Sequence, residues 1–338
     1  MVDLTVMGAG IFGLSIAWEA ARRGARVRVI DPAGPGAGAS GGLVGALAPH
    51  APEAWTPAKA LQLRALAMAP DWWAQIADAG GLSPGYARTG RVQPLADAGA
   101  VALAQARATG AATLWQGLAA WQVRPWQDGD PISPSGMVAQ DTLTARIHPR
   151  MALTALGAAI RARGGTVTTD APCRGPVIWA TGAAGLRALS QDLGHPVGRG
   201  EKGQALALRH AAPDAPQIYA PGLHIVPHAD GSVAIGSTSE RDYADATTTD
   251  AQIDALHARA VAVWPVLAGA PVVARWAGER PRAASRTLVL GPWPGRAGHF
   301  IANGGFKTGF AMAPLAAGLM VDLVLDGRDA LPDAWRLG

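Results

Sequence analysis

The first thirty residues alternate between short apolar runs and one helical segment. Residues 4–7 form an apolar-rich run that predicts a buried strand, and the alanine-rich residues 14–23 predict a helix. Residues 26–30 predict the next strand. This strand–helix–strand order predicts the first unit of a parallel sheet in an α/β fold.

Beyond this unit the pattern predicts many more elements, and it changes character along the chain. From residue 203 short strands dominate, including a hairpin that turns at residues 229–231. Residues 115–136 contain several prolines and tryptophans without a regular period, so no element is predicted there. The remaining helices are expected at 57–79, 98–109, 151–163, 250–264 and 308–325, and the strands at 86–95, 167–169, 177–180, 204–208, 224–227, 232–237, 272–276, 287–290 and 299–302. Such an order predicts two domains, one Rossmann-like and one mixed and largely antiparallel, between which the chain crosses more than once.

A glycine pattern lies between the first predicted strand and the first predicted helix. Residues 8–13 read Gly-Ala-Gly-Ile-Phe-Gly, which is G-x-G-x-x-G in the strand-to-helix setting that gives it meaning. In this setting Gly8 allows a tight turn, Gly10 lets a pyrophosphate approach the backbone, and Gly13 lets helix and strand pack closely. The helix N-terminus then offers N–H groups and a partial positive charge to the phosphates.

Asp31 follows the second predicted strand, 23 residues after Gly8. An acid at about this distance accepts hydrogen bonds from an adenosine ribose and repels a 2′-phosphate. Together with the glycine pattern it predicts a dinucleotide site, the alternative being a glycine-rich turn of some other α/β protein. The glycine-rich loop at residues 32–45, which contains Ala39, Ser40 and Gly41, either adds N–H groups to that site or is a flexible linker.

Composition and charge narrow the class of protein. Hydrophobic residues make up 49% of the 338 residues and charged residues 16%, which is typical of a globular enzyme with ample core. The net charge is +4, yet the basic residues are scattered without a run of four, which argues against a nucleic-acid surface. Cys173 is the only cysteine, so neither a disulfide framework nor a cysteine-based metal site is expected.

Targeting signals are not predicted. Asp3 precedes the first strand and no basic segment comes before it, which argues against a secretory signal. The longest apolar stretch, residues 311–325, is interrupted by Pro314 and Asp322 and is short for a membrane span. We therefore expect a cytoplasmic protein without a transmembrane segment.

Seven segments, spread over nearly the whole chain, form a recognisable series. They are VMGAGIFG at 6–13 with Asp31, ASGG at 39–42, HPRMALTALGAAIRARGG at 148–165, IWATGAAG at 178–185, GLHIVPHADGSVAIGSTSE at 222–240, WAGERPR at 276–282, and NGGFKTGFAMAPLAAGLMVDLVLDG at 303–327. Their order and spacing are more specific than any one of them. Together they resemble the D-amino-acid oxidase superfamily of flavoproteins, and most closely its glycine oxidase and sarcosine oxidase branch.

The resemblance implies an FAD-binding domain made of residues 1–45, 146–198 and 287–338, and a substrate domain made of residues 46–145 and 199–286. The FAD is expected to be non-covalent, because no cysteine lies near the terminal glycine loop. The residues expected to contact FAD are Gly8, Gly10, Ile11, Phe12, Gly13, Asp31, Ala39, Ser40, Gly41, Thr181, Gly182, Gly304, Gly305, Phe306, Lys307 and Thr308.

The resemblance also implies roles on the substrate side. Arg280 falls where these enzymes hold a substrate carboxylate, a task that suits the planar guanidinium, although a surface arginine is the alternative. Lys307 either stabilises negative charge on the reduced flavin or is a solvated lysine. His224 stands where glycine oxidases commonly have tyrosine, and it either hydrogen-bonds the substrate or sits satisfied in a strand. No metal site is expected.

The implied activity is FAD-dependent oxidation of the CH–NH bond of a small amino acid or secondary amine. Hydride would pass to flavin N5, and hydrolysis of the imine would give a 2-oxo acid and an amine, with O2 or a quinone as electron acceptor. Two alternatives stay open, a flavin enzyme that modifies the wobble uridine of tRNA and a partner-dependent subunit of an amine dehydrogenase. The oligomeric state is open as well.

Overall fold

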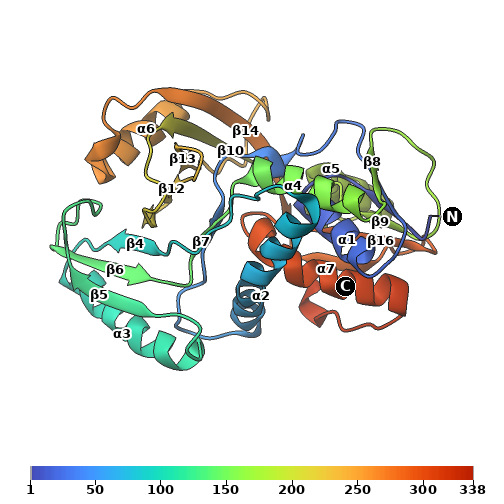
Figure 1. Cartoon of the computed structure of the whole chain (residues 1–338), viewed down its shortest axis with the longest axis horizontal. Helices are drawn as coiled ribbons and strands as arrows, with labels where there is room; N and C mark the ends of the chain where they lie inside the picture. The colour runs from blue at the N-terminus through green and yellow to red at the C-terminus, as the bar shows by residue number, and fades with distance from the viewer. Residues whose placement is uncertain (1, 338) are drawn as a thin grey trace.

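The computed structural model describes residues 2–337, whose strands form two large sheets on opposite sides of the molecule (Figure 1). The sheet at the right of Figure 1 has six strands in the order β15-β16-β9-β1-β2-β8. These strands are β1 (Leu4–Met7), β2 (Val27–Ile30), β8 (Thr166–Thr168), β9 (Val177–Trp179), β15 (Val289–Pro292) and β16 (His299–Asn303). All neighbours in this sheet run parallel except β15 and β16, so the predicted Rossmann-like α/β unit is confirmed.

The second sheet has eight strands and is largely antiparallel, as predicted. Its order is β14-β10-β13-β12-β11-β4-β6-β5, and the β11–β4 pair alone is parallel within it. The strands are β4 (Arg91–Pro94), β5 (Trp121–Pro125), β6 (Met137–Asp141), β10 (Gly198–Arg209), β11 (Gln217–Ala220), β12 (Leu223–Pro227), β13 (Ser232–Gly236) and β14 (Val272–Ala283). A short third sheet pairs β3 (Ala46–Leu47) with β7 (Ala145–Arg146).

Seven α-helices complete the described chain, and most of them cover the six-stranded sheet. The helix α1 packs against α4 and α7, and α6 covers a face of the eight-stranded sheet. The helices are α1 (Ile11–Arg22), α2 (Pro57–Gly80), α3 (Ala98–Leu114), α4 (Pro149–Ala162), α5 (Gly182–Leu193), α6 (Gln252–Val263) and α7 (Gly309–Asp326). Three short 3-10 turns are η1 (Ala39–Gly41), η2 (Pro265–Leu267) and η3 (Asp333–Trp335).

The long helix α2 belongs by its packing to the six-stranded sheet. Its buried side chains, among them Leu66, Trp72, Trp73 and Ile76, join one core with those of α1, α4 and α7. These tryptophans therefore serve the core, where each buried aromatic ring removes a large apolar area from water. The domain boundaries remain a prediction, in which α2 falls within the segment 46–145.

Helix α7 is long and apolar enough to cross a membrane by length and composition alone. Its 18 residues have a mean hydropathy of 1.6, and the helix continues through Pro314. The prediction that this stretch is too short to span a membrane is therefore wrong as far as length is concerned. However, 56% of the window is buried within the protein, and α7 packs against α1 and α2. Its apolar character is that of a core helix.

Several elements differ from the sequence prediction. The strand β5 lies within residues 115–136, where no element was predicted, and β6 begins directly after them. The helix α5 was not predicted. Of the strand predicted at 86–95, only β4 forms. The strand β14 runs on to Ala283 through Pro281, whereas the predicted strand ended at residue 276. An edge strand tolerates proline because one of its sides needs no ladder hydrogen bonds, and β14 is the edge strand.

Candidate functional site

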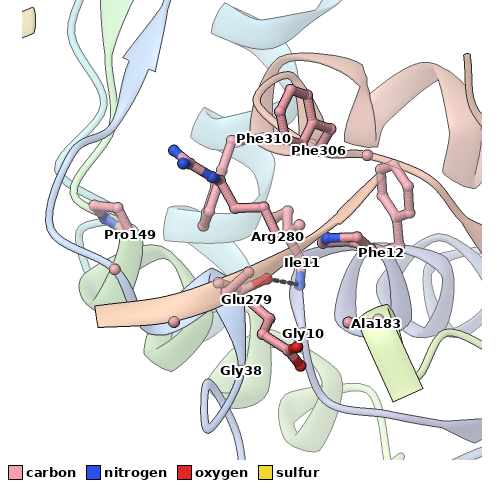
Figure 2. A pocket seen from close by; sticks show the side chains of 18 of the residues that line it. Gly10, Ile11, Phe12, Gly38, Pro149, Ala183, Glu279, Arg280, Phe306 and Phe310 are labelled. Atoms are coloured by element: carbon pink, nitrogen blue, oxygen red, sulfur yellow. Dashed lines mark hydrogen bonds between the residues drawn. The ribbon is translucent and has the colours of Figure 1, made fainter. Parts of the chain in front are cut away.

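One large cavity, of about 720 Å³, is lined by residues from both large sheets (Figure 2). Most of the residues predicted to contact FAD line it, together with His224, Arg280 and Lys307. Three predicted residues, Gly13, Gly41 and Gly304, do not line the cavity. The predicted residues that line it are Gly8, Gly10, Ile11, Phe12, Asp31, Ala39, Ser40, Thr181, Gly182, Gly305, Phe306, Lys307 and Thr308.

The glycine turn between β1 and α1 requires glycine for reasons of space. Gly8 has φ +103°, and a Cβ there would lie 2.4 Å from the carbonyl oxygen of Ala180. A Cβ on Gly13 would lie 1.9 Å from the carbonyl oxygen of Gly8. Both distances are far below van der Waals contact. The glycine turn can therefore pack this closely against Ala180 and against the first turn of α1 only because Gly8 and Gly13 have no side chains.

Polar contacts join this turn to the next strand and to the glycine-rich loop. The Asp31 carboxylate accepts hydrogen bonds from the N–H groups of Ala9 at 2.8 Å and Ala33 at 3.1 Å. The Ser40 hydroxyl oxygen accepts one from the N–H of Ile11 at 3.0 Å, drawn as the dashed line in Figure 2. The loop therefore lies directly over the N-terminus of α1, which has no side-chain cap.

Asn303, for which no role was predicted, connects two loops of the cavity. Its side-chain amide donates to the carbonyl oxygen of Gly182 at 2.8 Å, and its Oδ1 accepts from the N–H of Gly304 at 2.9 Å. These bonds join the start of α5 to the loop before α7. The pairing of two distant loops through one amide leaves no local pattern in the sequence that would predict it.

The loop before α7 is also fixed to the end of β14. The N–H of Phe306, a residue with φ +41°, donates to the carbonyl oxygen of Pro281 at 3.0 Å. A Cβ on Gly305 would lie 3.0 Å from the Phe12 ring, so this loop packs closely on α1 as well. The contact with β14 brings Phe306 and Lys307 beside Arg280, as Figure 2 shows for the phenylalanine.

Arg280 is buried, with 8% of its surface exposed, and its guanidinium is held by hydrogen bonds. Its Nη1 donates to the Ser237 hydroxyl at 2.6 Å, and its Nη2 donates to the carbonyl oxygens of Lys202 at 3.2 Å and Thr238. Gly203 on β10 leaves the necessary space, because a Cβ there would lie 2.3 Å from Nη2. Neither Ser237 nor Gly203 was predicted to take part.

The charge of Arg280 is not matched by a carboxylate. Within residues 2–337, no acidic side chain lies within ion-pair distance of this guanidinium, and its Nε–H is buried without a hydrogen-bond partner. Burial lowers the pKa of Arg280, while the charges of Glu201 and Glu240 act in the opposite direction. A buried cation without a counter-ion is costly, so this position favours the binding of an anion.

His224 lies on β12 opposite Gly236, with its ring centroid 4.9 Å from that of Tyr219. Burial, and then the positive charges of Arg91 and Lys307, lowers the pKa of His224 to about 4. The imidazole is therefore neutral at physiological pH. Its Nδ1 has no hydrogen-bond partner among the described residues, and the role of His224 stays a prediction.

A second histidine, His228, was not predicted and supports the glycine-rich loop from behind. It is 1% exposed, and its Nε2 lies 3.1 Å from the carbonyl oxygen of Leu43, which accepts only, so Nε2 carries the proton. Its ring lies 4.7 Å from that of His148, which caps α4 by accepting the N–H of Met151. Burial first, and then the charge of His148, lowers the pKa of His228 to about 4.

The buried His228 predicts a loss of stability in mild acid. In the unfolded chain histidine has a pKa near 6.5, whereas the pKa of His228 in the folded protein is about 4. Between these pH values the residue is therefore protonated in the unfolded state and neutral in the folded state. The free energy of unfolding should therefore fall by roughly 1–2 kcal/mol between pH 7 and pH 5 through this residue. Urea unfolding at both pH values measures it. His228→Gln should show a correspondingly smaller fall, and equal falls in the two proteins would contradict the prediction.

These features fit a flavin dinucleotide, because the glycine turn, the N-terminus of α1, Asp31 and the large cavity provide a phosphate site, a ribose acceptor and room for the ring. Comparisons with known proteins agree. The chain matches the family model for FAD-dependent oxidoreductases known as DAO over residues 3–323.

Individual relatives are similar in sequence and in fold. A glycine oxidase of Pseudomonas aeruginosa is 36% identical over 133 residues, which are 39% of this chain and 36% of that enzyme. The glycine oxidase of Geobacillus kaustophilus is 24% identical over 95% of this chain and 92% of its own, and its crystal structure superposes with a TM-score of 0.86. An iminodiacetate oxidase of Chelativorans sp. BNC1 has a TM-score of 0.85 at 22% identity, over 99% and 98% of the two chains. The chain therefore belongs to the DAO family of FAD-dependent oxidoreductases.

Proposed function

We propose that this protein uses FAD to oxidise the CH–NH bond of a small amino acid or secondary amine that carries a carboxylate. The observation that carries the proposal is the buried Arg280, which lines the cavity without an acidic partner in residues 2–337. A substrate carboxylate would supply the missing negative charge, and the planar guanidinium suits it because it can donate two parallel hydrogen bonds to a carboxylate.

The other residues of the cavity support the same chemistry. FAD, when bound, supplies the hydride acceptor, and the protein supplies placement and electrostatics. The neutral His224 offers hydrogen bonds to a substrate without adding a charge, which suits an amine that reacts in its neutral form. The apolar surface of Phe306, Phe310 and Ile11 limits the water around the reacting carbon.

The glycine-rich elements would hold the cofactor. The N-terminus of α1 and the loop bearing Ser40 would bind the pyrophosphate, and Asp31 would accept a hydrogen bond from the ribose. The loops at Thr181 and at residues 304–308, which Asn303 joins, would lie against the remainder of the flavin. The electron acceptor, O2 or a quinone, and the cytoplasmic location remain predictions.

The proposal is tested first on the purified protein. The visible spectrum should show bound flavin, acid precipitation should release all of the yellow colour, and phosphodiesterase should convert it to FMN. Anaerobic mixing with glycine, sarcosine, iminodiacetate and a set of D- and L-amino acids should then bleach the flavin for at least one carboxylate-bearing amine.

Matched amines without a carboxylate, such as dimethylamine for sarcosine, serve as the control and should bleach the flavin far more slowly. Colour that stays in the acid pellet would contradict the non-covalent cofactor. A colourless protein that ignores added FAD, or one that oxidises the carboxylate-free amines equally well, would overturn the proposed function.

A further inference from the structure

We propose that the substrate is an amine with two carboxylates, one bound by Arg280 and the other by Lys307. The inference rests on the proposed function and narrows it to a substrate class, the amino and imino dicarboxylates. It follows from the number of unpaired positive charges that the two sheets bring into one cavity.

Lys307 lies close to Arg280. Its Nζ is 5.4 Å from the centroid of the Phe306 ring, and the guanidinium carbon of Arg280 is 5.6 Å from the same centroid. Both side chains line the cavity. Burial, and after it the charge of Arg280, lowers the pKa of the Lys307 amine. The two positive charges therefore repel each other across a space from which water is partly excluded.

The neighbouring basic side chains, unlike these two, each meet a carboxylate. Arg282 pairs with the buried Glu201, which also accepts a hydrogen bond from Ser239. The amine of Lys202 lies 3.8 Å from carboxylate oxygens of both Glu240 and Asp250. Among these neighbours, then, the acidic side chains are already engaged by other cations.

Arg187 and Glu279, which line the same cavity, complete this pattern, with a distance of 3.0 Å and a further hydrogen bond from Tyr243 to the same carboxylate. In residues 2–337, neither Arg280 nor Lys307 has an acidic partner within 4 Å. Glu201, which stands opposite Arg280 in the β10–β14 pair, offsets the charge of both cations in part, and Glu240 that of Arg280, without forming an ion pair with either. Two unpaired cations in one cavity favour a ligand with two negative charges, because each buried charge is costly until it is paired.

The surroundings of Lys307 place its amine on the substrate side of the cavity. The charged groups that shift the pKa of Lys307 are Arg280 and Arg282 on β14 and Glu201 on β10. The charge of Lys307 in turn helps to lower the pKa of His224 on β12. All three strands belong to the eight-stranded sheet. The glycine turn that would hold the cofactor belongs to the six-stranded sheet, so a role against the second carboxylate fits this position better than a role limited to the flavin.

The test compares two substrates that differ by one charge, using the FAD-loaded enzyme. Iminodiacetate is the smallest secondary amine with two carboxylates, and N-(carbamoylmethyl)glycine replaces one carboxylate by a neutral amide of the same shape. Wild-type enzyme should show a higher kcat/KM for iminodiacetate. Because a hydrogen bond to a charged group contributes about 1.5–3 kcal/mol, Lys307→Met should lower the ratio of the two kcat/KM values roughly ten- to hundredfold.

Lys307→Arg should preserve much of the preference, since it keeps the charge. Lys59→Met, at a lysine on α2 that bonds only backbone carbonyls, is the matched control and should leave the ratio unchanged. A second readout needs no turnover, namely the change in the flavin spectrum on titration with succinate and with succinamate. Succinate should bind more tightly to the wild type, and Lys307→Met should remove that difference.

The outcomes separate the two levels of the proposal. If wild-type enzyme oxidises the amide as well as the dicarboxylate, or if Lys307→Met affects both substrates equally while its flavin spectrum stays native, the second carboxylate site is wrong and the proposed function stands. If no carboxylate-bearing amine bleaches the flavin, the proposed function itself fails. Should Lys307→Met not retain FAD, Lys307→Gln replaces it in both experiments.

Discussion

Arg280→Ala is expected to lower kcat/KM for a carboxylate-bearing amine by roughly ten- to two-hundredfold or more, while FAD stays bound. The guanidinium is buried and has no acidic partner in residues 2–337, so a substrate carboxylate would form a charge-assisted hydrogen bond with it. Losing such a bond costs about 1.5–3 kcal/mol, and each 1.4 kcal/mol is about tenfold. Steady-state kinetics with the flavin content measured in parallel gives the result.

The control for this change lies on the same strand. Arg275 of β14 is largely exposed and pairs with Asp254 at the surface, so Arg275→Ala should leave kcat/KM within about twofold. Arg280→Lys should recover only part of the loss, because an ammonium does not reproduce the planar fork. If Arg280→Ala holds its flavin and oxidises its best carboxylate substrate as fast as the wild type, the carboxylate is bound elsewhere.

Gly13→Ala is expected to abolish stable FAD binding. The added methyl carbon would lie 1.9 Å from the backbone carbonyl oxygen of Gly8, and neither atom belongs to a side chain that could move away. The start of α1 must shift away from β1, which disturbs the phosphate site and adds overpacking strain of about 1–3 kcal/mol or more. Flavin content after purification, and the Kd of FAD for the apoprotein, should show at least a tenfold loss of affinity.

A second helical glycine provides the comparison. A Cβ on Gly318, within α7, would meet no atom within 4 Å. Gly318→Ala should therefore keep normal FAD binding and raise the free energy of unfolding by about 0.4–1 kcal/mol, through a less flexible unfolded chain. Equal FAD affinity in the Gly13→Ala protein and the wild type would show that the close approach of α1 to the turn is not needed.

Local signals were sufficient for the cofactor domain. The turn at Gly8 and Gly13, the strands on either side and Asp31 lie within 31 residues, and each requirement is a property of neighbouring backbone. The family match and the parallel sheet confirm the predicted family, the FAD cofactor and the fold class. These motifs could be recognised in the sequence because the site that they form is built from elements adjacent in the chain.

Elements whose stability depends on distant partners were less predictable. The edge strand β5 is short and flanked by loops, and it exists because it pairs with β6 over five registered residues. The helix α5 begins at Gly182, in a segment for which the sequence predicted a loop. The carbonyl oxygen of Gly182 accepts a hydrogen bond from Asn303, which lies far away in the chain. Asn303, Ser237 and His228 likewise act on residues far away in the chain, and such long-range contacts leave no periodic signal.

The sequence by itself therefore determined the family and the cofactor, and it singled out Arg280, which lines the cavity and whose role remains a prediction. Only the tertiary structure decided which cations lack a partner. The pairing of Arg282 with Glu201, across two strands, leaves Arg280 and Lys307 without a carboxylate at ion-pair distance in residues 2–337. Residue spacing cannot reveal this, because ion pairing depends on distance and burial in three dimensions, and a side chain that is paired in one fold would be free in another.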